Sequence, residues 1–360
     1  MKNRIRLYGI IAAAALIGLG VAGCDNPTQS GTVQGGGSDI TEATAFDWTG
    51  ISAGAGSSPF NDDVIIGEVA YGNGMWIALG GSIGGSGTAG RTWIAYSQNG
   101  TDWIEGVEFP FPEGVVGVRS VTFGGGRWVA VGGVPYRVEQ WNVILHSADG
   151  KTWETGHTFE INNRISAIAY GSGRWVGSGR RPNGTGLMVT SVNGIDWEII
   201  DNDILELGHI AFGGGRWIGV QMGGRTDWFH STNGTDWELI PSWNLGVNAI
   251  AYGGGRWAAI STSGFWITTM RSTDGISWSS ENIQSSLRLH SMAWGNGRWF
   301  AVGGGETGNN MAYSEDGINW TFGAPFADGS EFRTPYNAVA HGGGRWVAVG
   351  WDGIMAWRND

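Results

Sequence analysis

Two short motifs alternate along most of the chain, and this repetition constrains the fold more than any other feature of the sequence. The first motif reads aromatic-Gly-x-Gly-x-Trp and occurs seven times, including one copy in which His341 leads. The second reads Ser-x-(Asp or Asn)-Gly-x-x-Trp and occurs six times, each time between two copies of the first. The closing residues of the first motif lie 40 to 52 positions apart: Trp76, Trp128, Trp175, Trp217, Trp257, Trp299 and Trp346.

Each repeating unit is predicted to contain four short strands. An apolar strand such as 167–170 precedes the glycine-rich segment, where Gly supplies the positive φ of a tight hairpin. A second strand such as 127–131 follows, and after a variable loop a third strand such as 143–146 leads through the second motif into a fourth. Four strands in 40 to 52 residues is typical of a β-propeller blade. A β-solenoid is the alternative, although its coils are usually shorter and need no alternation of two turns.

The two ends of the repeat region predict a closed ring. The seventh unit ends at 353–360 after its third strand, and its missing fourth strand would carry a Trp. The segment Ala45-Phe46-Asp47-Trp48-Thr49 is similar to fourth-strand segments such as Ile195-Asp196-Trp197-Glu198. We therefore predict an all-β, seven-bladed β-propeller with four-stranded blades over 45–360, its last blade closed by an N-terminal strand. Closure would remove an exposed sheet edge that invites aggregation.

Composition and charge exclude several other classes of protein. The 360 residues include 66 Gly and 22 Trp, but no Gly-X-Y period runs through them, which excludes collagen. Disorder is excluded because 41% of the residues are hydrophobic. A net charge of −11 leaves no basic footprint for nucleic acid. The single cysteine, Cys24, excludes internal disulfides and CxxC metal sites.

The first 44 residues are predicted to direct export and anchoring. Residues 1–6 are basic and 7–23 are apolar, which predicts a signal peptide over 1–23. Val21-Ala22-Gly23-Cys24 resembles the bacterial lipobox, so Cys24 is the expected lipidation site. Residues 24–44, rich in Gly, Ser and Thr, are expected to form a flexible tether. The expected location is the extracytoplasmic side of a bacterial membrane. An uncleaved anchor, or an ordinary signal peptide with an unrelated Cys, is the alternative.

The second motif resembles the Asp-box of the bacterial-neuraminidase-repeat family, which includes sialidases, photosystem II assembly lipoproteins and sortilin-like receptors. The family box usually has one more residue between Asp and Gly, which weakens the transfer of any particular activity. The Ser and Asp or Asn oxygens are expected to accept hydrogen bonds from the turn backbone. A structural acceptor, and no catalytic or metal-binding charge, is indicated because three Asn and three Asp share the position: Asn99, Asp149, Asn193, Asn233, Asp274 and Asp316.

Other repeated polar residues are also predicted to be structural. An arginine follows the glycines in six units, where its stem would pack beside Trp while its head remains in water. These residues are Arg127, Arg174, Arg216, Arg256, Arg298 and Arg345. His146 and His230 share one repeat position without a helical His pair or a nearby carboxylate set. The sequence therefore predicts no metal and no cofactor.

The ligand is expected to bind where the units vary. In a propeller of this strand order, loops between second and third strands and between blades share one end of the ring, and such loops often carry function. Residues there that the repeat does not require are Tyr136, Arg137, Trp141, Trp243, Trp266 and Trp351. A second candidate site is the channel mouth near Arg119, Asn248, His290 and Asn337. The alternative is that the aromatic residues only pack the loops onto the ring.

These observations predict a non-enzymatic, lipid-anchored, monomeric binding or assembly module for a protein or glycan. The alternative is a sialidase-like glycoside hydrolase. That resemblance implies three arginines and a Tyr–Glu pair, for which Arg119, Arg164, Arg288, Tyr336 and Glu331 are available. No spacing connects them into a site, and the Arg-(Ile or Leu)-Pro signature of the enzymes is missing.

Overall fold

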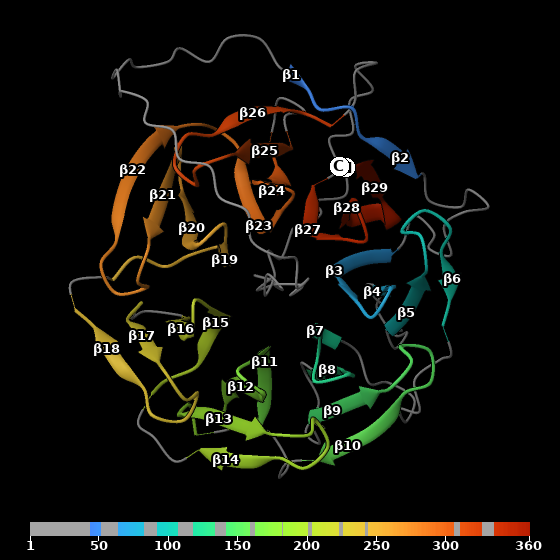
Figure 1. The fold of residues 1–360 in the computed structure, drawn as a ribbon, viewed down its shortest axis with the longest axis vertical. Helices are drawn as coiled ribbons and strands as arrows, with labels where there is room; N and C mark the ends of the chain where they lie inside the picture. The colour runs from blue at the N-terminus through green and yellow to red at the C-terminus, as the bar shows by residue number, and fades with distance from the viewer. Residues whose placement is uncertain are drawn as a thin grey trace, which may run out of the picture.

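The described residues form seven β-sheets arranged as blades around a central axis, as Figure 1 shows. The computed structural model describes residues 44–51, 64–82, 92–106, 118–133, 142–158, 163–181, 183–200, 204–222, 226–241, 244–305, 310–325 and 335–360. The predicted seven-bladed, four-stranded β-propeller is confirmed. Cys24, the predicted signal peptide and nearly all of the predicted tether lie outside the described residues.

Each blade runs outward from an inner strand that lines the axis. The inner strands are β3 (Val64–Gly72), β7 (Val118–Gly124), β11 (Arg164–Gly171), β15 (Leu207–Gly213), β19 (Ala249–Gly253), β23 (Arg288–Gly295) and β27 (Tyr336–Gly342). The second strands are β4 (Met75–Ser82), β8 (Arg127–Gly133), β12 (Arg174–Arg180), β16 (Arg216–Gln221), β20 (Arg256–Ser263), β24 (Arg298–Gly304) and β28 (Arg345–Gly350). Blades one to seven are numbered in this order.

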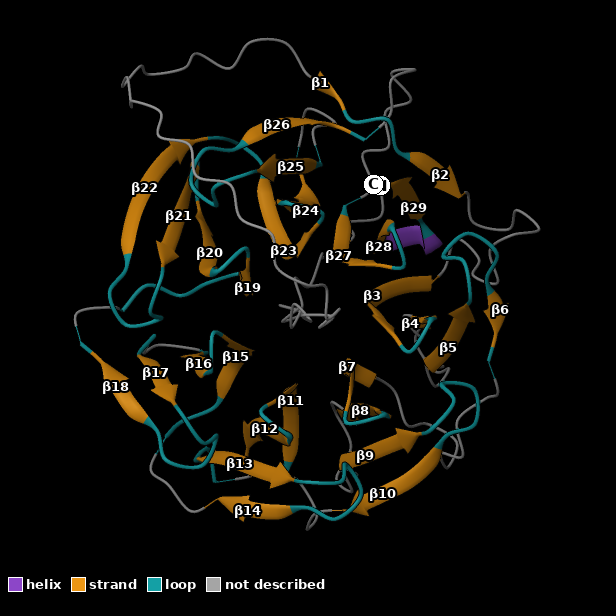
Figure 2. Cartoon of the chain, in the orientation of Figure 1, coloured by secondary structure: helices purple, strands orange, loops and turns teal. Residues whose placement is uncertain are grey.

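The third and fourth strands complete each blade. The third strands are β5 (Thr92–Ser97), β9 (Asn142–Ser147), β13 (Gly186–Ser191), β17 (Trp228–Ser231), β21 (Trp266–Ser272), β25 (Met311–Ser314) and β29 (Met355–Asn359). The outermost strands are β6 (Ile104–Glu105), β10 (Glu154–Thr158), β14 (Glu198–Ile200), β18 (Glu238–Ile240), β22 (Ser279–Gln284), β26 (Thr321–Ala324) and β2 (Thr49–Ile51). Figure 2 shows one short helix in this all-strand ring, the 3-10 turn η1 (Trp351–Gly353) between β28 and β29.

The N-terminal segment closes the ring as the sequence predicts. β2 pairs antiparallel with β29, with Thr49 opposite Trp357, and so supplies the fourth strand of blade seven. The strand β1 (Thr44–Ala45) pairs in parallel with β26 on the outer edge of blade six. Between them, Phe46 and Trp48 are buried against Phe300, which lies in blade six. This one segment therefore ties the first residues of the ring to its last two blades.

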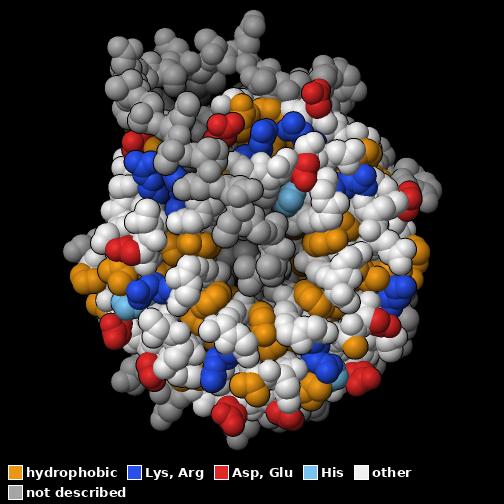
Figure 3. Space-filling model, viewed as in Figure 1, with side chains coloured by type: hydrophobic (Ala, Val, Ile, Leu, Met, Phe, Trp, Pro, Cys, Tyr) orange, Lys and Arg blue, Asp and Glu red, His pale blue; other side chains and the backbone are white. Residues whose placement is uncertain are grey.

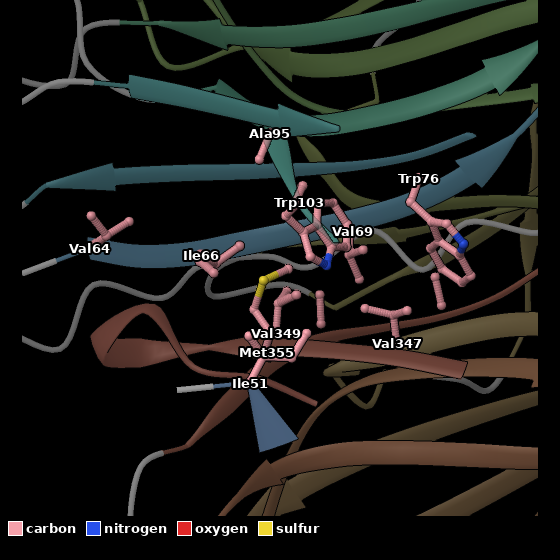
Figure 4. Packing of buried hydrophobic residues seen from close by; sticks show 13 residues of the cluster. Ile51, Val64, Ile66, Val69, Trp76, Ala95, Trp103, Val347, Val349 and Met355 are labelled. Carbon is pink, nitrogen blue, oxygen red and sulfur yellow. The ribbon is translucent and has the colours of Figure 1, made fainter. Parts of the chain in front are cut away.

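Apolar side chains fill the seams between neighbouring blades. Figure 4 shows the seam between blades seven and one, where Val347 and Val349 face Val69 and Trp76. Ile51, from the closing strand, packs into the same cluster. Hydrophobic contacts across every seam are the main stabilising contribution to a ring of this kind, because they are the contacts that join one sheet to the next.

Antiparallel strands give the ring two distinct ends. The turn end carries the glycine hairpins between first and second strands and the second-motif turns between third and fourth strands. The loop end carries the connections from second to third strands and from blade to blade. These two ends are the surfaces on which a site can lie.

Candidate functional site

The second-motif turns at the turn end are held by a repeated set of local hydrogen bonds. In each copy the Ser Oγ accepts from the backbone N–H of the motif Gly, at 2.8–2.9 Å. The Asp or Asn Oδ1 accepts from two further backbone N–H groups at 2.8–3.0 Å, as Asn99 and Asp274 both do. Asn and Asp make the same bonds to the backbone. This position therefore needs a hydrogen-bond acceptor and does not need a charge, as the sequence indicates.

The backbone donors explain the acidity of the aspartates in these turns. Backbone hydrogen bonds lower the pKa of Asp274 to about 2. The pKa of Asp149 is lowered, chiefly by the backbone N–H of Thr152. The carboxylates accept bonds inside their own turns, and none of them is arranged as a proton donor.

Several of the repeated arginines contact the next blade. The Cδ atoms of Arg127, Arg174 and Arg216 lie against the motif glycine of the following blade. The Arg345 guanidinium donates to the backbone oxygen of Asn99, across the seam between blades seven and one. Arg127 also lies 3.2 Å from the His146 ring, and Arg216 lies 3.0 Å from the His230 ring. Burial, with the nearby arginine, lowers the pKa of both histidines.

A continuous collar of rings surrounds the axis at the turn end. Each ring leads a first motif, is half-buried, and lies 4.6–5.2 Å from the Trp of its own blade. Each also covers the first glycine of the preceding blade, where a Cβ atom would overlap the ring. The collar consists of Tyr71, Phe123, Tyr170, Phe212, Tyr252, Trp294 and His341. Figure 3 shows hydrophobic side chains repeated around the centre of one face, inside a wider ring of basic side chains.

His341 is the one collar member that carries a titratable ring nitrogen. Its Nε2 lies 2.7 Å from Oδ1 of Asp360, near the surface. Its ring still packs 4.6 Å from Trp346, as the aromatic members do in their blades. The histidine therefore fills the same structural place as the other six rings.

The loop end presents the most exposed aromatic side chains of the described residues. Phe265 is 71% exposed and Trp266 is 51% exposed. They lie at the tip of the β20–β21 hairpin, where Ser263 pairs with Trp266 across a two-residue turn. Gly264 adopts a φ of +59° in that turn, which favours glycine. Trp266 is one of the site residues that the sequence predicts. Phe265 was not predicted, although a glycine followed by two aromatic residues could have indicated an exposed turn there.

The other loop-end candidates divide into two groups. Tyr136, Arg137, Trp141 and Trp243 lie outside the described residues. Trp351 lies in η1, half-buried, and its Nε1 donates to Oδ1 of Asn337 at 3.1 Å. The structure therefore places Trp266 and Trp351 at the same end of the ring but in different blades.

Two of the channel-mouth candidates, Asn337 and His290, make contacts between blades. Asn337 Nδ2 donates to the Ile66 backbone oxygen at 3.0 Å, across the closing seam.

Asn248 Oδ1 accepts from the backbone N–H and the hydroxyl of Thr262, at 2.6 and 2.8 Å. His290 Nδ1 lies 3.2 Å from the Tyr336 backbone oxygen, and burial lowers the His290 pKa. Arg119 lies in β7. Asn337, Asn248 and His290 therefore make contacts that support the fold of the ring.

Of the residues that a sialidase-like site would use, Tyr336 is enclosed and Arg164 is paired with a carboxylate. Tyr336 is fully buried, and burial raises the pKa of its phenol. Arg164 pairs with Glu206 at 2.7 Å, and Ser166 also donates to that carboxylate. Glu331 lies outside the described residues. A phenol enclosed by the seam cannot reach a substrate in this conformation.

No group of three or more His, Cys, Asp and Glu side chains in the described residues is arranged to hold a metal ion. No helix that the structure describes has the length and apolar character needed to cross a membrane.

Solved structures of other proteins share the fold of this chain. No family model matches the chain, and no curated protein matches it. The solved structure of YCF48 from Cyanidioschyzon merolae is 14% identical, with a TM-score of 0.58, covering 87% of this chain and 98% of that one.

Two other solved structures are similarly close in shape. A catalytically inactive histidine variant of virginiamycin B lyase from Staphylococcus aureus, with quinupristin, is 13% identical, with a TM-score of 0.62 over 86% of this chain and 99% of that one. A chain of the Mitotic Checkpoint Complex is 12% identical, with a TM-score of 0.61 over 91% and 99%. At these identities the likeness shows the β-propeller fold, which a chain of the Mitotic Checkpoint Complex and a lyase share.

Proposed function

We propose that this β-propeller is a non-enzymatic binding or assembly module, anchored through Cys24 on the extracytoplasmic side of a bacterial membrane. Its partner is a protein or a glycan, held at the loop end. The observation that carries the proposal is the exposure of Phe265 and Trp266 at one hairpin tip. Exposed aromatic rings are costly to leave in water, and they are enriched where proteins bind partners.

The sequence and the comparisons support the anchoring and the binding role. The order of basic, apolar and Cys-terminated residues in 1–24 supports lipidation. The second motif supports kinship with Asp-box propellers, a group that includes assembly factors and receptors. One similar structure comes from a multiprotein complex, the Mitotic Checkpoint Complex. Its chain is 12% identical to this one, so it supports a binding role by analogy of fold.

The burial of Tyr336 supports a non-enzymatic role over a sialidase-like one. A sialidase needs its tyrosine free to attack the sugar, and this phenol is enclosed. Its raised pKa also keeps it protonated. The virginiamycin B lyase likeness supplies no catalytic residue at 13% identity.

Photocrosslinking in living cells tests the proposal. A photoreactive amino acid replaces Trp266 in the full chain, and a matched variant carries it at Leu239, which is 54% exposed on the outer strand β18. We expect one dominant adduct, to a protein or to a glycan, from position 266 and none from position 239. Equal labelling from both positions, or none from either, would contradict a binding site at the hairpin tip.

A further inference from the structure

The outermost strand of blade five is an unusually long exposed edge. β22 has six residues, whereas β6, β10, β14 and β18 have two, five, three and three. Five of its six residues are exposed, and it lies on the rim of the ring in Figure 1. The edge of blade six, β26, is instead covered by β1. Blade five therefore offers the longest uncovered edge among the described strands.

The register identifies which backbone groups of β22 face outward. The Ser285 N–H donates to the Phe265 oxygen at 2.9 Å, so these two residues form a hydrogen-bonded pair. Pairs alternate along an antiparallel ladder, and Trp266 opposite Gln284 is therefore a non-hydrogen-bonded pair. It follows that Ser280, Asn282 and Gln284 direct both N–H and C=O away from β21. Three donors and three acceptors stand in a row that only another extended backbone matches.

The usual protections of an edge strand are largely missing from β22. Native edges are often short, or carry Lys, Pro or inward-pointing charges. The residues whose backbone groups point away from β21 are Ser280, Asn282 and Gln284, and none of them has a charged side chain. Glu281 is the one charged side chain in the strand, and Ile283 packs against the buried cluster between blades five and six. An edge of this kind is ready for strand pairing.

Two neighbouring features indicate what pairs with it. β1 on β26 shows that the rim of this ring accepts an added strand from an extended segment. Trp266 lies directly opposite Gln284, so its exposed indole is on the same face of the sheet as the Gln284 side chain, at one end of β22. An added strand would therefore gain backbone hydrogen bonds along its length and an apolar contact at one end.

We propose that an extended segment of a partner protein adds to blade five as a fifth strand, along β22, with an apolar side chain against Trp266. This inference rests on the proposed binding function and names the class of partner. Glu281 favours a basic residue opposite it. A second copy of this chain is disfavoured as the occupant, because two molecules each of net charge −11 repel.

Substitutions in β22 separate backbone pairing from side-chain contact. Asn282→Pro removes an outward N–H and leaves the ladder to β21 intact, since proline is tolerated at outward positions of edge strands. Asn282→Ala keeps the N–H and is its matched control. The probe is a phage-displayed library of random peptides selected on the full-length chain in detergent. We expect the selected peptides to lose about tenfold or more in affinity for Asn282→Pro and to stay within about twofold for Asn282→Ala.

Two more measurements use the intact edge. In the wild-type chain, a bound peptide should slow amide hydrogen exchange at Ser280, Asn282 and Gln284. Glu281→Lys should shift the selected peptides from basic to acidic sequences. Selection of no peptide, or unchanged binding and exchange in the Asn282→Pro variant, overturns the proposal. If sedimentation shows that the wild-type chain is a dimer and that the Asn282→Pro variant is a monomer, the proposal is also overturned, because the edge then binds a second copy.

The two proposals fail in distinguishable ways. If the adduct at position 266 persists after Asn282→Pro, the binding function stands and strand addition is refuted. If the chain that carries the photoreactive residue at 266 and is otherwise unchanged gives no adduct, the binding function itself is refuted.

Discussion

Trp48→Ala tests the closure of the ring by its N-terminal segment. Trp48 is 4% exposed and its ring lies 5.5 Å from that of Phe300, edge to face. Its Nε1 has no hydrogen-bond partner among the described atoms, so the substitution mainly removes packing. Truncation of a buried Trp typically costs about 3–5 kcal/mol of the free energy of unfolding. At roughly 2 °C per kcal/mol for a domain of this size, the melting temperature should fall by about 6–10 °C.

Trp266→Ala is the matched control, because it makes the same change at a side chain that is 51% exposed. Its free energy of unfolding should change by less than about 0.5 kcal/mol. Thermal unfolding followed by circular dichroism measures both variants. Deletion of residues 45–50 should destabilise the ring at least as much as Trp48→Ala, whereas deletion of 26–40 should not. Equal melting temperatures for Trp48→Ala and Trp266→Ala would refute the placement of the segment between blades six and seven.

Three further predictions concern the anchor, the turns and the collar. Cys24→Ala should move the exported protein from membrane to soluble fractions; unchanged detergent partitioning would contradict lipidation. The depressed pKa of Asp274, about 2, implies stability that is present above its unfolded value of about 4 and is lost as the pH falls toward 2. Asp274→Asn keeps an oxygen that can accept the backbone bonds but removes the titrating carboxylate, so the free energy of unfolding, measured by denaturation, should fall less between pH 4 and pH 2 than in the wild type; an unaltered pH profile would count against this assignment. Gly213→Ala should lower the melting temperature because its Cβ would overlap the Tyr252 ring, and a melting temperature equal to the wild type would show that the collar is loosely packed.

Much of the fold was predictable because the two motifs act locally. The Ser and Asp or Asn oxygens bond to backbone groups two or three residues away, so the turn forms wherever the motif occurs. The closing strand was predictable for a related reason: Trp48 stands in a segment similar to other fourth-strand segments. The prediction that glycine supplies positive φ holds for Gly74. The first glycine of the motif has a different role.

The candidate site was only partly predictable. Trp266 was predicted because it interrupts the repeat, but its exposure depends on how far the β20–β21 hairpin projects. Asn248, His290 and Asn337 were predicted at the channel mouth, where His290 and Asn337 make contacts between blades and Asn248 makes a contact within blade five. The β22 edge was not predicted, because a strand's outward-facing groups depend on the register of its neighbours.

The amino-acid sequence by itself determined the number of blades, the two turn types and the segment that closes the ring. These features depend on hydrogen bonds between near neighbours and on a period that repeats. Only the tertiary structure decided the contacts between blades. Gly72 is needed because Phe123 of the next blade lies against it, and Asn337 finds its acceptor at Ile66, 271 positions away. Such requirements arise when the ring closes, because closure brings side chains together that no local pattern connects.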